Sequence, residues 1–199
     1  MKKNTSLFLL VIFSSLFLFG CTKKDQSKNS NLNLEENIIP TSTSMTTIKP
    51  TQTKNQDAFV AIKTKDGEIV LKLYQNLAPK TVANFIAKAN SGFYKNLIFH
   101  RVIPGFMAQG GDPLGTGTGG GNQKSEINQT PFKRGTIGLA RAGNIEISND
   151  SQFFICFTTE GCQHLTGDYV NFGEVVSGLD VLDKIKQGDK IIDITTTTK

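Results

Sequence analysis

The sequence of 199 residues contains no tryptophan, only two histidines and only three cysteines. Neither His100 nor His164 has Cys, His or Asp residues around it at the spacing of metal ligands. Protein zinc sites are built from such clusters, so we expect no metal site. The stretch 115–121 matches a GxGxxG pattern, but residues that are poor in helices and then Pro131 follow it. A dinucleotide site would begin a helix there, so we expect no cofactor.

The greater part of the chain also lacks an excess of positive charge. The formal net charge is +5, but residues 1–55 hold seven Lys and Arg against three Asp and Glu. The rest of the chain holds 15 against 14, which makes it nearly neutral. A nucleic-acid-binding domain needs positive charge gathered on its folded surface. We therefore expect no nucleic-acid partner.

The longest apolar run is too short to cross a bilayer as a helix. It spans residues 7–19, follows two lysines and leads directly into Gly20-Cys21. This arrangement is typical of a secretory signal peptide. The residues Leu-Phe-Gly-Cys that end at Cys21 resemble a bacterial lipobox, in which the cysteine thiol receives a diacylglyceryl group. We interpret residues 1–20 as a signal peptide and Cys21 as a lipidation site; a plain cleaved signal peptide and an uncleaved anchor are the alternatives.

Residues 21–56 begin with this cysteine and continue as a polar segment without an aromatic residue. Such a segment cannot bury enough apolar surface to offset its chain entropy, so we expect a disordered tether. The tether would hold a folded domain, residues 57–199, clear of a membrane. Together these segments predict a membrane-anchored lipoprotein of the cell envelope, located outside the cytoplasm.

Hydrophobic patterning predicts a mainly β domain. Apolar and polar residues alternate over 59–61 and 69–73, on either side of Lys65-Asp66-Gly67, which predicts a β-hairpin. An apolar stripe over 82–89 predicts a helix that starts near Pro79 and stops at Gly92. A second helix is expected over 179–186. Further short strands are expected over 98–103, 107–110, 135–141, 152–157, 170–176 and 191–196. Short strands in this number with only two helices favour a closed antiparallel barrel, because closure removes exposed edges.

Three segments carry the most specific information in the sequence. They are FHRVIPGFMAQGGD (99–112), SQFFIC (151–156) and HLTGDYVNFG (164–173). In this order they resemble the signature segments of the cyclophilins, which are peptidyl-prolyl isomerases. The resemblance covers residues 58–196 and implies a closed eight-stranded antiparallel β-barrel capped by two α-helices. It also implies an enzyme that speeds rotation about X–Pro peptide bonds.

The chemistry of such an enzyme can be stated from the peptide bond itself. Rotation about the amide C–N bond is opposed by ~18–20 kcal/mol because the bond has partial double-bond character. In the twisted state the proline nitrogen recovers its lone pair, so a hydrogen-bond donor aimed at it stabilises that state over both planar isomers. A guanidinium suits this role because it stays charged and offers several N–H groups.

The resemblance implies which residues form the site. Arg101 is the implied donor, Gln109 is expected to hold the substrate backbone, and Phe106 completes the implied catalytic set. Residues 140–142 would present main-chain groups to the peptide before proline. The implied substrate-binding residues are Met107, Ala140, Arg141, Ala142, Phe154, His164, Leu165 and Tyr169.

The expected partners are proline-containing segments of exported polypeptides, whose folding the enzyme would assist. We expect a monomer. The alternative is a proline-directed binding module or chaperone that uses the same groove without turnover. Cys156 and Cys162 remain after lipidation; they can form a disulfide that closes a short loop, or stay as a buried free thiol and a loop cysteine.

Overall fold

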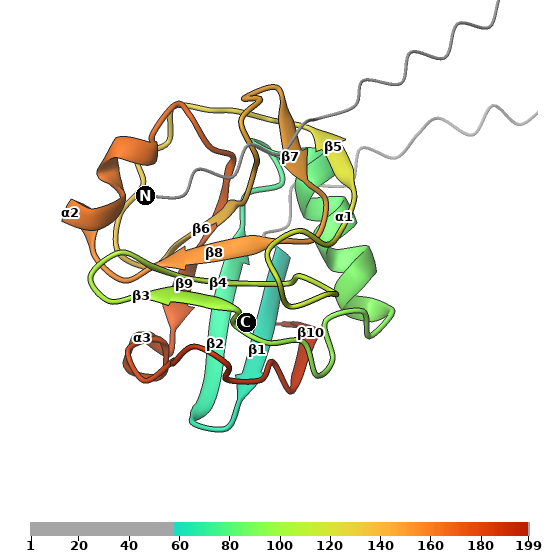
Figure 1. The fold of residues 1–199 in the computed structure, drawn as a ribbon, viewed down its shortest axis with the longest axis vertical. Helices are drawn as coiled ribbons and strands as arrows, with labels where there is room; N and C mark the ends of the chain where they lie inside the picture. Colours follow the sequence, from blue (N-terminus) through green and yellow to red (C-terminus); the bar gives the residue numbers. More distant parts are fainter. Residues whose placement is uncertain (1–57, 199) are drawn as a thin grey trace, which may run out of the picture. The chain divides into compact units, whose positions relative to one another are not determined.

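The computed structural model describes residues 58–198 (Figure 1). The predicted signal peptide, the predicted lipidation site Cys21 and the predicted tether lie outside the described residues. Within the described part, no helix is long and apolar enough to cross a membrane.

Eight strands form one sheet, in the order β10-β1-β2-β9-β6-β8-β4-β3. All of its ladders are antiparallel. The predicted hairpin is confirmed as β1 and β2, which a two-residue loop joins. A separate ribbon, which the patterning did not predict, pairs β5 (Asn122–Lys124) with β7 (Ile147–Asn149). The strands of the main sheet are β1 (Ala58–Thr64), β2 (Gly67–Leu73), β3 (Arg101–Ile103), β4 (Met107–Gly110), β6 (Thr136–Leu139), β8 (Phe153–Cys156), β9 (Asn171–Ser177) and β10 (Asp193–Thr197).

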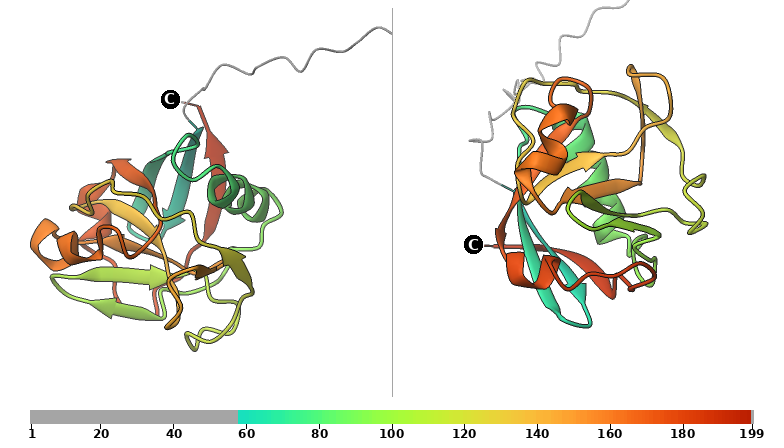
Figure 2. Two further views of the ribbon diagram at one scale, coloured as in Figure 1. Left: turned by 90° about the horizontal axis from the view of Figure 1, so that it is seen from above. Right: turned by 60° about the vertical axis from the view of Figure 1, so that its left-hand side comes forward.

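The sheet is strongly curled but open, so the prediction of a closed barrel was wrong in that respect. In Figure 1 and in the two views of Figure 2, β3 and β4 cross the direction of β1 and β2. Strands β3 and β10 are the two edges. The segments that precede them, 96–99 and 188–191, are joined by one bridge, Ile98 to Lys190, and by irregular backbone hydrogen bonds. Within the described residues β3 and β10 themselves share no ladder, so the sheet does not close.

One long helix and one short helix stand where two cap helices were predicted. Helix α1 (Pro79–Asn90) confirms the first, with proline in its first turn and Gly92 just after its end at φ +73°. The second is shorter than predicted, since α3 covers only Leu179–Leu182. Helix α2 (Thr159–Cys162) and the 3₁₀ turn η1 (Gln163–Leu165) were not predicted. A four-residue helix has too few residues to show an apolar period.

Strand β8 separates two apolar clusters. All four of its residues are buried, although side chains of a strand alternate between the two faces of a sheet. Phe153 and Ile155 belong to the main core, which also contains the buried side of α1. Phe154 and Cys156 belong to a second cluster, completed by Met107, Phe132, Cys162 and Leu165. We call this second set the outer cluster; it forms the base of the site described next.

Candidate active site

Four strands place one row of residues across the sheet. Arg101 on β3 lies opposite Gln109 on β4, Gln109 lies opposite Phe154 on β8, and Phe154 lies opposite Gly138 on β6. Directly opposed residues of neighbouring strands project from the same face of a sheet. The row therefore brings a cation, an amide and an aromatic ring to the face that carries the outer cluster.

A cavity of about 200 Å³ opens over this row. Ten of the eleven residues that the resemblance implied line it: Arg101, Phe106, Met107, Gln109, Ala140, Arg141, Phe154, His164, Leu165 and Tyr169. The eleventh, Ala142, lines a neighbouring hollow of about 580 Å³ that shares three of these residues. The structure thus brings the implied residues together, although they come from widely separated parts of the sequence.

The floor of the cavity is apolar and tightly packed. Met107 is 1% exposed, Phe154 is 4% exposed and Leu165 is 6% exposed. The ring of Phe132 stacks on Phe154 from below, with ring centroids 5.7 Å apart. Such a floor excludes water from one side of any ligand, which strengthens the electrostatic interactions made there.

A chain of amide hydrogen bonds supports the polar side of the cavity. Arg101 Nη1 donates to Gln109 Oε1 at 3.3 Å, and Gln109 Nε2 donates to Gln152 Oε1 at 2.9 Å. Gln152, which is 2% exposed, donates in turn to the carbonyls of Gly117 and Gly119 at 3.1 and 2.8 Å. Within residues 58–198 no carboxylate forms an ion pair with Arg101. Its guanidinium therefore carries an unneutralised charge at the edge of an apolar cavity.

Arg141 is the second arginine that lines the cavity. Its Nε donates to the Asp168 carbonyl at 2.9 Å, and its guanidinium carbon lies 4.5 Å from the ring centre of Tyr169. The Tyr169 ring meets Phe154 edge to face at 5.7 Å. The main-chain N–H and C=O of Ala140 already bond to Gln152 O and Asn149 N. Arg141 is thus held by Asp168 and Tyr169, and the Ala140 main chain is already paired within the protein.

His100, which precedes Arg101, lies against Gly117 of the glycine-rich stretch 115–121. Both of its ring nitrogens are buried without a hydrogen-bond partner. Burial lowers the pKa of His100, the nearby Asp112 carboxylate partly opposes this, and the charge of Arg101 lowers it further. A neutral imidazole is therefore favoured here. In the part of the chain that the structure describes, no group of three or more His, Cys, Asp or Glu residues is placed to hold a metal ion.

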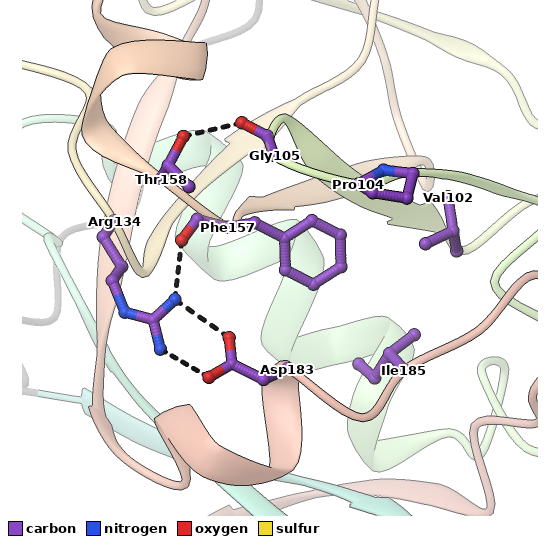
Figure 3. A pocket seen from close by; sticks show the side chains of 8 residues that line it. All are labelled: Val102, Pro104, Gly105, Arg134, Phe157, Thr158, Asp183 and Ile185. Atoms are coloured by element: carbon purple, nitrogen blue, oxygen red, sulfur yellow. Dashed lines mark hydrogen bonds and ion pairs between the residues drawn. The ribbon is translucent and has the colours of Figure 1, made fainter.

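A second hollow of about 250 Å³ also contains an arginine (Figure 3). Val102, Pro104, Phe157 and Ile185 give it an apolar side, while Arg134 and Asp183 form the other. Both terminal nitrogens of Arg134 bond the Asp183 carboxylate at 2.9 Å, and Nη1 also donates to Phe157 O at 2.6 Å. These bonds hold the pKa of Asp183 below its usual value. Because the charge of Arg134 is neutralised within the protein, this hollow has no cation available for a ligand.

The family model described as "Cyclophilin type peptidyl-prolyl cis-trans isomerase/CLD" matches residues 59–198. The chain belongs to this family. It is 50% identical over 140 residues to a peptidyl-prolyl cis-trans isomerase of Helicobacter pylori, a match that covers 67% of this chain and 83% of that protein. It is 44% identical over 141 residues to the Synechococcus elongatus protein of the same name, covering 69% of this chain and 94% of the relative.

The fold agrees with solved cyclophilins. A crystal structure of a Cryptosporidium parvum cyclophilin-type isomerase matches with a TM-score of 0.66 at 34% identity, covering 72% of this chain and 99% of that one. A second structure, of the same parasite enzyme in the presence of the dipeptide Ala-Pro, matches with a TM-score of 0.65 at 34% identity, covering 71% and 99%. The chain is thus a cyclophilin-type peptidyl-prolyl cis-trans isomerase, with a mainly β fold built on a curled eight-stranded sheet.

Three residues that support this cyclophilin site were not given a role from the sequence. Gln152 orients Gln109, and Phe132 lies under Phe154. Gly138 leaves the room that Phe154 occupies, because a Cβ there would lie 2.6 Å from Phe154 Cζ and 2.7 Å from Phe132 Cε1. Gln152 was visible within the segment 151–156, as a polar residue directly before four apolar ones. The sequence holds no comparable signal for Phe132 or Gly138.

The structure pairs the two cysteines that the sequence left open. Cys156 and Cys162 form a disulfide with their Cα atoms 6.1 Å apart, within the range usual for such bonds. Both are fully buried in the outer cluster. The disulfide therefore lies directly behind the floor of the cavity.

Proposed function

We propose that Arg101 drives the isomerisation by stabilising the twisted X–Pro bond. The proline ring would enter the apolar cavity over Met107, Phe154 and Leu165. The guanidinium of Arg101 would then donate to the proline nitrogen as its lone pair develops. No covalent bond forms or breaks and no proton needs to be transferred, so the rate gain comes from binding the twisted state better than either planar isomer.

One observation supports this role more than any other. Two arginines line the apolar cavity without a carboxylate partner in residues 58–198, but Arg141 already donates to three main-chain carbonyls, whereas within the described residues Arg101 donates to none. Its bonded partner is the neutral amide of Gln109, which Gln152 holds from the other side. Because no carboxylate of the described residues holds it, the guanidinium can donate to a ligand without breaking an ion pair. Preorganised donors of this kind are the largest single contribution to catalysis in many enzymes.

We propose X–Pro segments of peptides as the substrate class. The Ala-Pro dipeptide present with the Cryptosporidium parvum relative is of this class. The neighbouring hollow, which Ala142, Asn144 and Gly120 help to line, would receive the residues that precede proline. Since the Ala140 main chain is already paired, Arg141 is the residue whose main chain we expect to hold the peptide there.

The test is the cis–trans exchange of a proline peptide followed by NMR. The solved relative contains almost nothing beyond this fold, so residues 57–199 can be produced by themselves. We expect the wild-type domain to accelerate exchange, and Arg101→Ala to lose about 100-fold of that acceleration. Arg101 is exposed at a sheet edge, so the variant should keep its fold. If the wild type accelerates exchange and Arg101→Ala accelerates it equally well, the mechanism is contradicted.

The alternative function, a proline-directed binding module or chaperone, uses the same cavity without turnover. The free charge of Arg101 argues against it, because binding alone needs no donor at the proline nitrogen. The same experiment separates the two. A module that only binds shifts peptide resonances but leaves the exchange rate between isomers at its uncatalysed value.

We further propose that the enzyme works outside the cytoplasm on exported polypeptides, anchored through a lipid on Cys21. The support is the sequence alone: a short positive region, an apolar run of signal-peptide length and a lipobox-like ending. Two acyl chains would give a stable anchor. Mass spectrometry of the membrane-extracted protein should show an acylated N-terminal Cys21, and Cys21→Ser should release the protein from the membrane fraction. An unmodified mature protein would contradict the anchor and leave the enzymatic proposal untouched.

A further inference from the structure

The disulfide joins two walls of the active-site cavity that come from different parts of the fold. Cys156 is the last residue of β8, two positions after Phe154, and it lies opposite Met107 in the β4–β8 ladder. It is therefore fixed in the sheet beneath the floor of the cavity. Its partner, Cys162, is the last residue of α2.

The wall beyond Cys162 has little regular structure of its own. The 3₁₀ turn η1 follows directly and carries His164 and Leu165, which both line the cavity. Helix α2 has four residues and η1 has three. Helices this short are not stable by themselves, because the first turn fixes many dihedral angles for one hydrogen bond. The position of His164 and Leu165 must therefore come from contacts outside these turns.

Few polar contacts hold this segment to the sheet. Thr158 donates to the Gly105 carbonyl at 2.6 Å, Thr159 accepts from the Arg134 N–H at 3.1 Å, and Thr166 accepts from the Phe132 N–H at 3.0 Å. These contacts lie at the two ends of the segment. Between them, the disulfide is the covalent link, and both of its sulfurs lie within the outer cluster.

We infer that the Cys156–Cys162 disulfide positions the wall that carries His164 and Leu165, and so sets the affinity of the cavity for proline peptides. This inference rests on the proposed substrate site. With the bond intact, Leu165 stays packed beside Phe154 and the ring of His164 stays near Phe106, at a centroid distance of 5.7 Å. With the bond broken, the peptide must order this wall as it binds. Arg101 lies on β3, away from this wall, so its action on the twisted state is unchanged.

Breaking the disulfide should weaken peptide binding but should not slow the isomerisation of bound peptide. Ordering a side chain on binding costs ~0.5–1.5 kcal/mol, which corresponds to a roughly three- to tenfold loss of affinity. We expect that loss in the dissociation constant of the peptide. We expect the exchange rate of the bound peptide to stay within about twofold, because the donor itself has not moved.

The experiment compares residues 57–199 in three forms: oxidised wild type, wild type reduced with dithiothreitol, and the double variant Cys156→Ala/Cys162→Ala. Reduction converts the disulfide to two thiols, and the dithiol reagent supplies two electrons and two protons as it becomes a disulfide. An Ala-Pro peptide is titrated into each form, and NMR gives its dissociation constant and its exchange rate at saturation. The reduced protein and the double variant should both bind about three- to tenfold more weakly.

The controls make each outcome decisive. The domain contains no cysteine besides these two, so dithiothreitol should change nothing in the double variant. Resonances of the main core report whether the fold persists. Unchanged affinity in the reduced and double-variant forms overturns the proposal, and so does global unfolding in both, because the bond would then hold the fold and not one wall. Absent exchange in the wild type would defeat the proposed mechanism, but the affinities would still test the role of the disulfide.

Discussion

Arg101 and Arg134 lie at the edges of two different apolar hollows, and they differ in what surrounds their charge. Arg134 is held by both oxygens of Asp183 and by the Phe157 carbonyl, at the hollow of Figure 3. Arg101 has one bond to a neutral amide. An arginine that is already paired stabilises the fold. An arginine whose charge is unpaired beside a dry surface can act on a ligand, so the surroundings of the charge, and not the presence of arginine, distinguish the two hollows.

The comparison is tested most strongly by replacing each arginine with lysine. At Arg101 the change keeps the charge but removes the planar fork that reaches both the proline nitrogen and Gln109. We expect catalytic acceleration to fall about tenfold or more. The matched variant Arg134→Lys should leave acceleration within about twofold, since its charge faces Asp183. Peptide exchange measures the acceleration of both variants. If both lost it equally, the pairing of the arginine charge would not determine which hollow is catalytic.

A second prediction concerns the floor that makes the Arg101 hollow dry. Gly138→Ala would place a methyl group 2.6 Å from Phe154 Cζ, so Phe154 and Phe132 must shift. Overpacking of this kind costs about 1–3 kcal/mol of unfolding free energy. We expect kcat/KM to fall about five- to tenfold as the floor moves. Gly143→Ala is the control, because a Cβ there meets nothing within 4 Å. Urea unfolding and peptide exchange check both effects, and an unperturbed Gly138→Ala variant would contradict them.

Removing the paired arginine should affect stability and not catalysis. Arg134→Ala deletes an ion pair whose side chains are 38% and 51% exposed. Pairs at such partly exposed positions contribute about 0.2–1 kcal/mol to stability, so we expect a loss near the upper end of that range, because the pair is bidentate. Acceleration should be unchanged within error. A catalytic defect in a folded Arg134→Ala protein would assign a role to the hollow of Figure 3 that its pairing argues against.

The smallest expected effect is on the pH dependence of folding stability, and it comes from His100, next to Arg101. Its pKa is lowered from 6.5 by burial, so the unfolded chain binds a proton at higher pH than the folded protein does. The stability due to the neutral ring is therefore fully present above pH 6.5 and decreases as the pH falls toward the lower folded pKa. His100→Phe should flatten that decrease below pH 6.5, measured as the free energy of urea unfolding at several pH values. If the unfolding free energy of wild type and of His100→Phe depended on pH in the same way, His100 would not be held neutral by burial.

Most of the site could be predicted because its decisive residues lie within contiguous segments. Arg101 and Gln109 are eight positions apart, on the two strands of one tight hairpin, so a local motif determines that they meet. Long apolar periods likewise predicted α1 and the β1–β2 hairpin. The sequence could not predict α2, because four residues carry no period. It could not predict the open edge between β3 and β10 either, because closure depends on backbone pairing between segments far apart in the sequence.

The rest of the site depends on contacts between distant segments. Gly138 faces Phe154 through the β6–β8 ladder, and Phe132 reaches the same ring from a loop. The cysteines are six positions apart, which is compatible with a bond or with two free thiols. Only the end of β8 and the end of α2, once both are placed in space, decide that they pair.

The most direct test separates the affinity of Arg101→Ala for a proline peptide from its effect on the exchange rate at saturation. If the guanidinium acts on the twisted bond, the dissociation constant should change by less than about threefold while exchange of the bound peptide falls about 100-fold. Equal falls in affinity and exchange would mean that Arg101 binds planar and twisted peptides alike. That result would contradict the central claim that its unpaired charge stabilises the twisted X–Pro bond more than either planar isomer.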